Sequence, residues 1–383
     1  MPSLLWKTDF DGRKVLVAAG LFATERGDVA AATGGRLFLF VPEDAEYRLR
    51  SELDLKAGIT GLAAGRPGVG RENRDDIVVS TAEKIIIAGI RREALAVLAQ
   101  AGPEPGAQFA DVAAGDLDGD GRYEIVAAAS GQETIYVYRT AGAADTGPGI
   151  ELVGIRVVPG SPRFVEVFPG PGGRPAIAVA YQRDGGSGLA LYYLTARGFE
   201  AGPVLEALPF VISSLAAGNF MERPGTELAF GGAGGTVWLV GAGEKLDVLM
   251  VTDSLGTAVS ALAGSGNDTA RLMAGTPEGN VFIFNYPVGK SPDLAFSTVE
   301  GVTGLAALPG ERVAAGTSMG GLQVWSLSPG SSRPRGYIVM PGDTLWIISK
   351  KFGVPVEQIL SVNQNIKNPE VIMPGQLIKI PAP

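Results

Sequence analysis

The sequence predicts a mainly β protein, a seven-bladed β-propeller followed by a small α+β domain. Three observations support this fold class. Glycine contributes 55 and proline 26 of the 383 residues, yet 46% of the residues are apolar and only 19% are charged. Such a composition favours many short strands joined by tight turns over a disordered chain. A strand of small residues recurs seven times, and the pattern becomes helical in the last 47 residues.

The recurring strand is built from alanine, glycine and a few aliphatic residues. Its successive copies end 44 to 54 residues apart. The copies, of which the fourth and seventh are weaker, end at Gly20, Gly65, Gly115, Pro169, Gly218, Gly264 and Leu308. Because the blades of a propeller converge near its axis, the strand with the smallest side chains is expected at the innermost position.

Each copy is followed by two more strands and then by a looser fourth one. The second strands are expected to begin at Asp28, Asp76, Glu124, Ala176, Glu227, Arg271 and Arg312. The third strands are expected to begin at Arg36, Lys84, Thr134, Gly188, Thr236, Asn280 and Gly321. Seven units of four strands predict a β-propeller over residues 1–327. The alternative is a fortuitous repeat within one or two β-sandwiches.

The seventh unit has no fourth strand of its own. A short linker rich in proline, serine and glycine, residues 328–336, follows its third strand directly. The N-terminal segment SLLWKTDF, residues 3–10, has the outer-strand pattern. We therefore expect residues 3–10 to complete the last blade and close the ring, which would leave no open sheet edge at the seam.

An acidic loop, residues 116–124, lies between the first two strands of the third unit. Its alternating oxygen atoms suit a hard cation, and Gly121 permits the sharp turn that such a loop needs. The expected ligands are Asp116, Asp118, Asp120, the carbonyl of Arg122 and Glu124. The loop is not an EF-hand, because Ala127 stands where that motif needs a bidentate glutamate.

This loop and the strands around it resemble the FG-GAP or VCBS repeat of integrin-type propellers. The resemblance implies one structural Ca²⁺ ion in blade three. It is specific to that blade, since Arg223 stands among the corresponding positions of blade five and would repel a cation. A solvated acidic turn without an ion is the alternative interpretation.

The C-terminal segment, residues 337–383, has a different pattern with the expected order β-α-α-β. A brief strand over residues 337–340 leads to a turn in which Asp343 or Thr344 caps a helix. Leu345, Ile348 and Phe352 recur at helical spacing, and Gly353 ends that helix. A second helix is expected from Val354, and a returning strand over residues 376–380.

This segment resembles a LysM domain along its whole length, through GDTLW, KKFGV, the central Asn363 and the closing MPGQ and IKIP. The resemblance implies binding of glycans that contain N-acetylglucosamine, chiefly peptidoglycan or chitin. It places the groove between two loops, with Gly342, Asp343, Thr344 and Leu345 on one wall and Val371, Ile372, Met373 and Pro374 on the other. A groove with exposed backbone amides and apolar side chains suits acetamido groups.

The composition excludes several kinds of chemistry. The chain has no histidine and no cysteine, so imidazole bases, thiolate nucleophiles, iron–sulfur clusters and zinc sites with Cys or His ligands are ruled out. A net charge of −8 argues against general nucleic-acid binding. The sequence has no run of 18 apolar residues, so no membrane span is expected.

Two functions follow as hypotheses. The first is a non-catalytic cell-wall protein, with the LysM-like module bound to peptidoglycan and the propeller as a scaffold for an unknown protein partner. The alternative is a propeller-type polysaccharide lyase or glycosidase that uses paired carboxylates, for which Glu133, Glu166 and Asp184 are candidates without diagnostic spacing.

The expected location is the cell wall or the spore envelope. Asp9 and Asp11 interrupt the N-terminus where an export signal needs an apolar run. A LysM-like module without such a signal resembles proteins made in the mother cell of endospore-forming bacteria. A misassigned start that removed an upstream signal peptide is the alternative.

Overall fold

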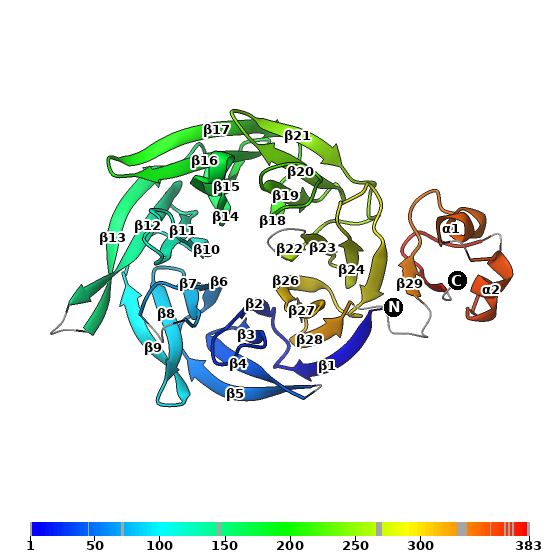
Figure 1. The fold of residues 1–383 in the computed structure, drawn as a ribbon, viewed down its shortest axis with the longest axis horizontal. Coiled ribbons are helices and arrows are strands. Elements are labelled where there is room, and N and C mark those ends of the chain that lie inside the picture. Colours follow the sequence, from blue (N-terminus) through cyan, green and yellow to red (C-terminus); the bar gives the residue numbers. More distant parts are fainter. Residues whose placement is uncertain are drawn as a thin grey trace.

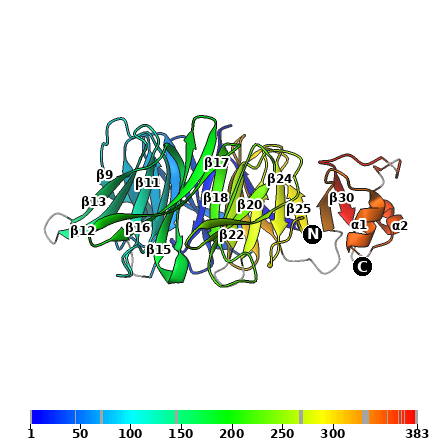
Figure 2. The same cartoon turned by 90° about the horizontal axis from the view of Figure 1, so that it is seen from above.

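The computed structural model describes residues 2–44, 46–69, 73–143, 147–265, 270–327, 335–352, 354–363, 365–366, 368–369 and 371–380. Seven four-stranded antiparallel sheets surround a central axis (Figure 1). The edge-on view shows the sheets as a disc with a small helical domain beside it (Figure 2). The predicted fold class, a seven-bladed propeller with a small C-terminal α+β domain, is confirmed.

The first four blades follow one another along the chain, each running from the axis outwards. Blade one contains β2 (Leu16–Gly20), β3 (Asp28–Thr33), β4 (Arg36–Glu43) and β5 (Glu46–Asp54), and blade two contains β6 (Ile59–Gly65), β7 (Asp76–Thr81), β8 (Ile85–Arg91) and β9 (Ala94–Ala101). Blade three contains β10 (Phe109–Gly115), β11 (Glu124–Ala129), β12 (Thr134–Ala143) and β13 (Gly147–Val157), and blade four contains β14 (Ser161–Pro169), β15 (Pro175–Arg183), β16 (Gly186–Thr195) and β17 (Gly198–Leu208).

The last three blades continue the ring. Blade five contains β18 (Ile212–Gly218), β19 (Glu227–Gly232), β20 (Val237–Ala242) and β21 (Leu246–Val251), and blade six contains β22 (Ala261–Ser265), β23 (Arg271–Gly275), β24 (Asn280–Phe284) and β25 (Leu294–Ser297). Blade seven combines β26 (Val302–Leu308), β27 (Arg312–Thr317) and β28 (Gly321–Ser326) with the N-terminal β1 (Ser3–Asp9). β1 pairs antiparallel with β28, from Ser3 opposite Ser326 to Asp9 opposite Gly321.

The core lies between the blades. Buried apolar side chains form a cluster at each junction of neighbouring blades in the described part of the chain. Every residue of β7 and of β11 is buried, which explains why these second strands are continuous apolar runs rather than alternating ones. The aliphatic and small side chains that made the repeat visible are therefore those that hold adjacent blades together.

Hydroxyl groups at the start of the inner strands tie several blades to the next one. Ser260 Oγ donates a hydrogen bond to the carbonyl of Val302 at 2.6 Å, and Thr303 Oγ1 donates one to Val15 at 2.8 Å. The second of these bonds spans the seam between blade seven and blade one. Because each donor and acceptor is partly buried, these bonds also satisfy backbone groups that water reaches poorly.

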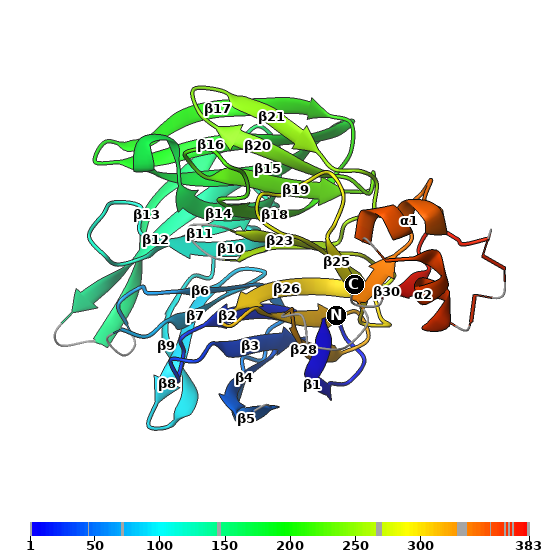
Figure 3. The ribbon, with the colours of Figure 1, turned by 45° about the vertical axis from the view of Figure 1, so that its right-hand side comes forward.

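The C-terminal domain consists of β29 (Arg335–Ile338), α1 (Leu345–Phe352), α2 (Val356–Ser361) and β30 (Leu377–Ile380). β29 and β30 pair antiparallel, and β29 lies beside β25 at the outer edge of blade six (Figures 1 and 3). Tyr337 and Ile338 belong to the same buried cluster as apolar residues of blades five and six. Among the described residues no helix is long and apolar enough to cross a membrane.

Two predicted boundaries fall on parts of the chain that are not described. Most of the predicted linker, residues 328–334, lies outside the described residues, and β29 already begins at Arg335. The predicted end of the first helix at Gly353 lies outside them as well. The second helix starts at Val356, two residues later than expected, because Pro355 has extended backbone angles and precedes it as its cap.

Candidate functional site

The first predicted wall of the glycan groove is the turn between β29 and α1. Gly342 has a backbone φ of 90° and is exposed, a conformation that glycine adopts without strain. Thr344 caps the helix, since its Oγ1 accepts the backbone N–H of Ile347 at 3.2 Å. Leu345 is only 3% exposed and packs into the domain core. Gly342 and Thr344 thus present this wall to solvent, whereas Leu345 supports it from beneath.

Asp343 holds the turn together from inside. Its Oδ2 accepts the backbone N–H of Met340 at 2.7 Å and also the hydroxyl of Tyr337. Burial, the hydrogen bond to Asp343 and the charge of that residue all raise the pKa of Tyr337 above its ordinary value. The carboxylate predicted as a glycan contact is therefore engaged in shaping the turn.

The second predicted wall, residues 371–374, is tied to the first by main-chain bonds. Gly375 donates to the carbonyl of Val339 at 2.8 Å, and Val339 donates to the carbonyl of Gln376 at 2.9 Å. Val371 and Met373 are 55% and 66% exposed. The other two residues of this wall differ in role: Ile372 is half-buried against the core, and Pro374 is exposed.

The central asparagine and an exposed tryptophan have roles that the sequence motifs do not reveal. Asn363 is 3% exposed and bridges the domain, because its Nδ2 donates to Ile359 at 2.7 Å and its Oδ1 accepts from Lys379 at 2.7 Å. Trp346 is 65% exposed, next to the first wall, with the Lys350 ammonium 5.7 Å from its ring. Helical periodicity could have found Trp346, since Leu345 and Ile348 occupy the inward face.

The three aspartates of the acidic loop converge. One carboxylate oxygen each of Asp116, Asp118 and Asp120 lies within 4.8 Å of the others. Asp116 accepts the backbone N–H groups of Gly119 and Gly121 at 2.7 and 3.0 Å, and Asp120 accepts that of Arg122 at 2.7 Å. Oxygen donors at this separation fit a hard cation such as Ca²⁺.

Glu124, the fifth predicted ligand, is not among the three converging carboxylates. It is 2% exposed, and its Oε2 accepts the backbone N–H of Leu117 at 2.8 Å. Burial raises its pKa, and the nearby charges of Asp118 and Asp120 raise it further. The structure thus brings the three aspartates together without the carboxylate of Glu124.

The role of Glu124 recurs in other blades. Glu227 of blade five accepts the backbone N–H of Phe220 at 2.8 Å, and Asp28 of blade one accepts that of Ala23 at 2.6 Å. In each case an acid that opens the second strand holds the preceding loop. This repetition assigns Glu124 to loop architecture and explains why an acid stands there even in blades that lack the acidic triplet.

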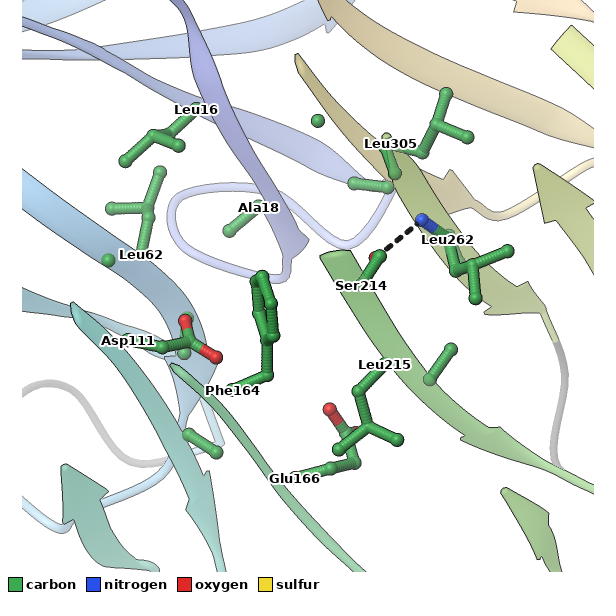
Figure 4. A pocket seen from close by; sticks show the side chains of 18 of the residues that line it. Leu16, Ala18, Leu62, Asp111, Phe164, Glu166, Ser214, Leu215, Leu262 and Leu305 are labelled. Atoms are coloured by element: carbon green, nitrogen blue, oxygen red, sulfur yellow. Dashed lines mark hydrogen bonds between the residues drawn. The ribbon is translucent and has the colours of Figure 1, made fainter. Parts of the chain in front are cut away.

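The carboxylates considered for catalysis come from different places. Glu133 and Asp184 are exposed in the tight turns after β11 and β15, and Glu133 has a positive φ of 51°. Glu166 instead faces the central channel, where Asp111 of the neighbouring blade is also directed (Figure 4). Burial, followed by the charge of Asp111, raises the pKa of Glu166 to about 8.

Comparison with protein families supports both parts of the chain. The LysM domain family matches residues 337–381, and the FG-GAP repeat family matches residues 109–138, which contain the acidic loop. The C-terminal domain is thus similar to domains that bind peptidoglycan and other N-acetylglucosamine glycans. The FG-GAP match covers a single blade.

Two curated relatives from Bacillus species match only the LysM region. SpoIVD-associated factor A of Bacillus subtilis (strain 168) is 48% identical over 46 residues, 12% of each chain. Spore coat assembly protein ExsA of Bacillus cereus is 48% identical over 46 residues, 12% of this chain and 7% of the relative. The chain thus spans only a small fraction of the length of these relatives.

The propeller resembles solved structures in fold alone. The WD40 β-propeller domain of Doa1 superimposes with a TM-score of 0.62, covering 85% of this chain and 97% of that one, at 12% sequence identity. A sequence identity this low supports no inference about shared ligands or partners.

Proposed function

We propose that the chain is a non-catalytic binding protein whose C-terminal domain attaches to peptidoglycan and whose propeller is a scaffold for a protein partner. The observation that carries the proposal is the exposed apolar and backbone surface of the LysM-like domain. Val371 and Met373 expose apolar surface in a segment that Gly375 bonds to Val339, three residues before the exposed Gly342. Apolar side chains next to main-chain donors and acceptors suit the methyl and amide parts of an acetamido group.

The proposal includes the absence of catalysis. Glu133, Glu166 and Asp184 lie in two separate turns and in the channel, so they offer no obvious acid and base on either side of one bond. A turnover screen with muropeptides and uronic-acid polymers tests this part. Release of products by the wild-type chain would contradict it.

The proposed place of action is the cell wall or the spore envelope. Two relatives of the LysM region are named SpoIVD-associated factor A and Spore coat assembly protein ExsA. A single LysM-like domain is expected to bind weakly, so retention on a wall polymer would gain from several copies on one assembly. A fluorescent fusion that stays diffuse throughout sporulation would contradict the spore envelope as the location.

We also propose that the acidic loop binds one structural Ca²⁺ through Asp116, Asp118 and Asp120, with the carbonyl of Arg122 as a further ligand. The convergence of the three carboxylates supports this assignment. A bound ion would neutralise charges that otherwise repel one another at the surface of blade three.

Sedimentation of the full chain with insoluble peptidoglycan, and separately with chitin, tests the glycan assignment. Val371→Ser and Met373→Ser should lower the bound fraction several-fold because they remove exposed apolar contacts without touching the core. Val204→Ser on the outer edge of blade four, where Val204 is 44% exposed, is the matched control. Asp343 is not a suitable test residue because its carboxylate stabilises the turn.

Failure of the wild-type chain to sediment with either polymer would contradict the proposal. Equal loss in the Val204→Ser control would show that the apolar surface acts non-specifically. Preference for chitin over peptidoglycan would retain glycan binding and change the polymer.

A further inference from the structure

Blade four departs from the other blades where it lines the central channel. The channel encloses about 510 Å³ and is lined by the inner strands of all seven blades. Glu166 of β14 pairs with Ala178 of the second strand. At the same register position the other blades have alanine, namely Ala18, Ala63, Ala113, Ala216, Ala263 and Ala306. One glutamate thus stands in a ring of small side chains.

Two further residues of the same strand break the pattern. Phe164 occupies the position of Gly61, Asp111, Ser214 and Gly304 in blades two, three, five and seven, and its aromatic ring lies in the channel (Figure 4). Arg163, one residue earlier, occupies the position of the hydroxyl residues that tie other blades together, such as Ser260. The corresponding residues of blades two, three, five and seven are Thr60, Ala110, Ser213 and Thr303, so blade four differs from them in placing a charge there.

Arg163 lies in a depression at the channel mouth with two more cations. The depression measures about 690 Å³ and adjoins the channel, since Lys14 and Thr60 line both. Arg13 and Lys14 come from the loop before blade one, whereas Arg163 comes from blade four. No carboxylate occurs among the described residues that line the depression, although the chain as a whole has a net charge of −8.

The two arginines are the cations without an ionic partner. Lys14 faces Asp111 of the channel and lowers the pKa of that carboxyl, although burial raises this pKa overall. The charge of Lys14 is therefore partly balanced by Asp111. Neither Arg13 nor Arg163 forms an ion pair with any residue that the structure describes. Guanidinium groups are suited to bidentate contacts with carboxylate or phosphate.

We propose that the channel mouth binds a small ligand with at least two anionic groups, carboxylate or phosphate, held between Arg13 and Arg163. The Phe164 ring lies at the inner side of this site and supplies an apolar contact to the body of the ligand. The site belongs to the propeller and is separate from the LysM-like groove. It therefore goes beyond the proposed function and does not depend on glycan binding.

Topology supplies a matched control. Inner strands begin at the channel mouth, so in the antiparallel meander the turn between β16 and β17 lies at the opposite end of blade four. Arg197 is exposed in that turn and forms no ion pair with a described residue. Arg197→Glu thus changes the net charge of the chain as much as Arg163→Glu does, but far from the mouth.

Isothermal titration calorimetry of the full chain at low ionic strength tests the proposal with three probes: inorganic phosphate, citrate and triglutamate. At least one probe should bind the wild type, and Arg163→Glu and Arg13→Glu should each weaken that binding about tenfold or more, as the loss of a charge-assisted hydrogen bond predicts. The Arg197→Glu variant should bind like the wild type. The probe that binds distinguishes phosphate from small-molecule and peptide carboxylates.

The proposal fails if none of the probes binds the wild type. It also fails if Arg197→Glu weakens binding as much as Arg163→Glu, because net charge alone would then explain the effect. If either charge reversal lowers the melting temperature of the propeller, the milder Arg163→Gln and Arg13→Gln variants replace it. Unchanged binding by both glutamine variants would overturn the site.

Discussion

The hydroxyl of Tyr337 donates a hydrogen bond to the carboxylate of Asp343, across the turn that forms the first wall of the candidate groove. Tyr337 is 2% exposed and Asp343 also accepts the N–H of Met340, so the turn is held by a buried donor and a backbone donor together. This pair joins the surface of the LysM-like domain to its core.

Tyr337→Phe should destabilise the C-terminal domain by about 1 kcal/mol, because one buried hydrogen bond is lost while Asp343 keeps its backbone donor. Asp343→Ala should cost about 2 kcal/mol or more, since it leaves both donors unpaired. Hydrogen exchange of the Met340 amide measures the effect. Equal protection in the wild type and Asp343→Ala would contradict the assignment.

Calcium should stabilise blade three. Added Ca²⁺ is expected to raise the melting temperature of the wild-type chain, since an ion that binds only the folded state shifts the unfolding equilibrium. Asp118→Ala and Asp120→Ala should abolish this rise. Glu222→Ala, an exposed acid in the corresponding loop of blade five, is the control and should keep it. A calcium effect that survives in both aspartate variants would rule out this loop as its origin.

The buried acids that open the second strands should be essential for stability. Glu227 is fully buried and accepts the backbone N–H groups of Phe220 and Met221 at 2.8 and 3.3 Å. Glu227→Ala leaves these donors without a partner and should cost about 2 to 3 kcal/mol. Urea unfolding checks the value against Glu222→Ala, which should lie within about 0.5 kcal/mol of the wild type. Similar losses in both variants would contradict the role of Glu227.

The channel glutamate should make stability depend on pH. The pKa of Glu166 is about 8 in the folded chain, above its ordinary 4.5, so the folded state retains a proton that the unfolded chain releases. Stability should therefore fall as pH rises between these values. At about pH 9 the free energy of unfolding of Glu166→Gln should exceed that of the wild type by about 1 to 2 kcal/mol, after screening by channel water. At about pH 5 the two should differ little.

Melting curves across this pH range test the prediction. Asp111 and Lys14 also face the channel, and Asp111 has a raised pKa of about 7, so some pH dependence should remain in Glu166→Gln. Glu133→Gln, in an exposed turn, should follow the wild type. An advantage of Glu166→Gln that is the same at both ends of the range would contradict the titration.

The stability of the propeller should depend on the contact between its first and last blades. Trp6 of β1 lies with its ring 5.1 Å from Phe40 and 5.8 Å from Tyr47, both of blade one. Trp6→Ala should cost about 2 to 3 kcal/mol, somewhat less than for a fully buried tryptophan. Leu5→Ala on the outer face, where Leu5 is 37% exposed, should change little. Thermal unfolding distinguishes them, and equal melting temperatures would contradict this role of Trp6.

Much of the architecture was predictable because it is local and repeated. The alanine and glycine strands, the apolar second strands and the turns between them recur at short range, and each unit must bury its faces against the next. The C-terminal domain was predictable for a related reason: the spacing of Leu345 and Ile348 defines the buried face of its first helix.

Single positions were harder to interpret, because a carboxylate has the same appearance in a sequence whatever it contacts. Asp343 is a predicted glycan contact whose carboxylate also holds its own turn, and Glu124 holds the loop that carries the three aspartates. Their partners are backbone N–H groups, which every sequence contains and no motif marks.

The sequence by itself determined the number of blades, the order of their strands and the kind of small domain that follows. Only the tertiary structure decided which distant residues share a surface. Arg13 and Arg163 are 150 positions apart in the sequence, yet they line one depression because closure of the ring brings blade one and blade four to the same channel. Local patterns determine each blade, whereas sites between blades depend on how the whole ring closes.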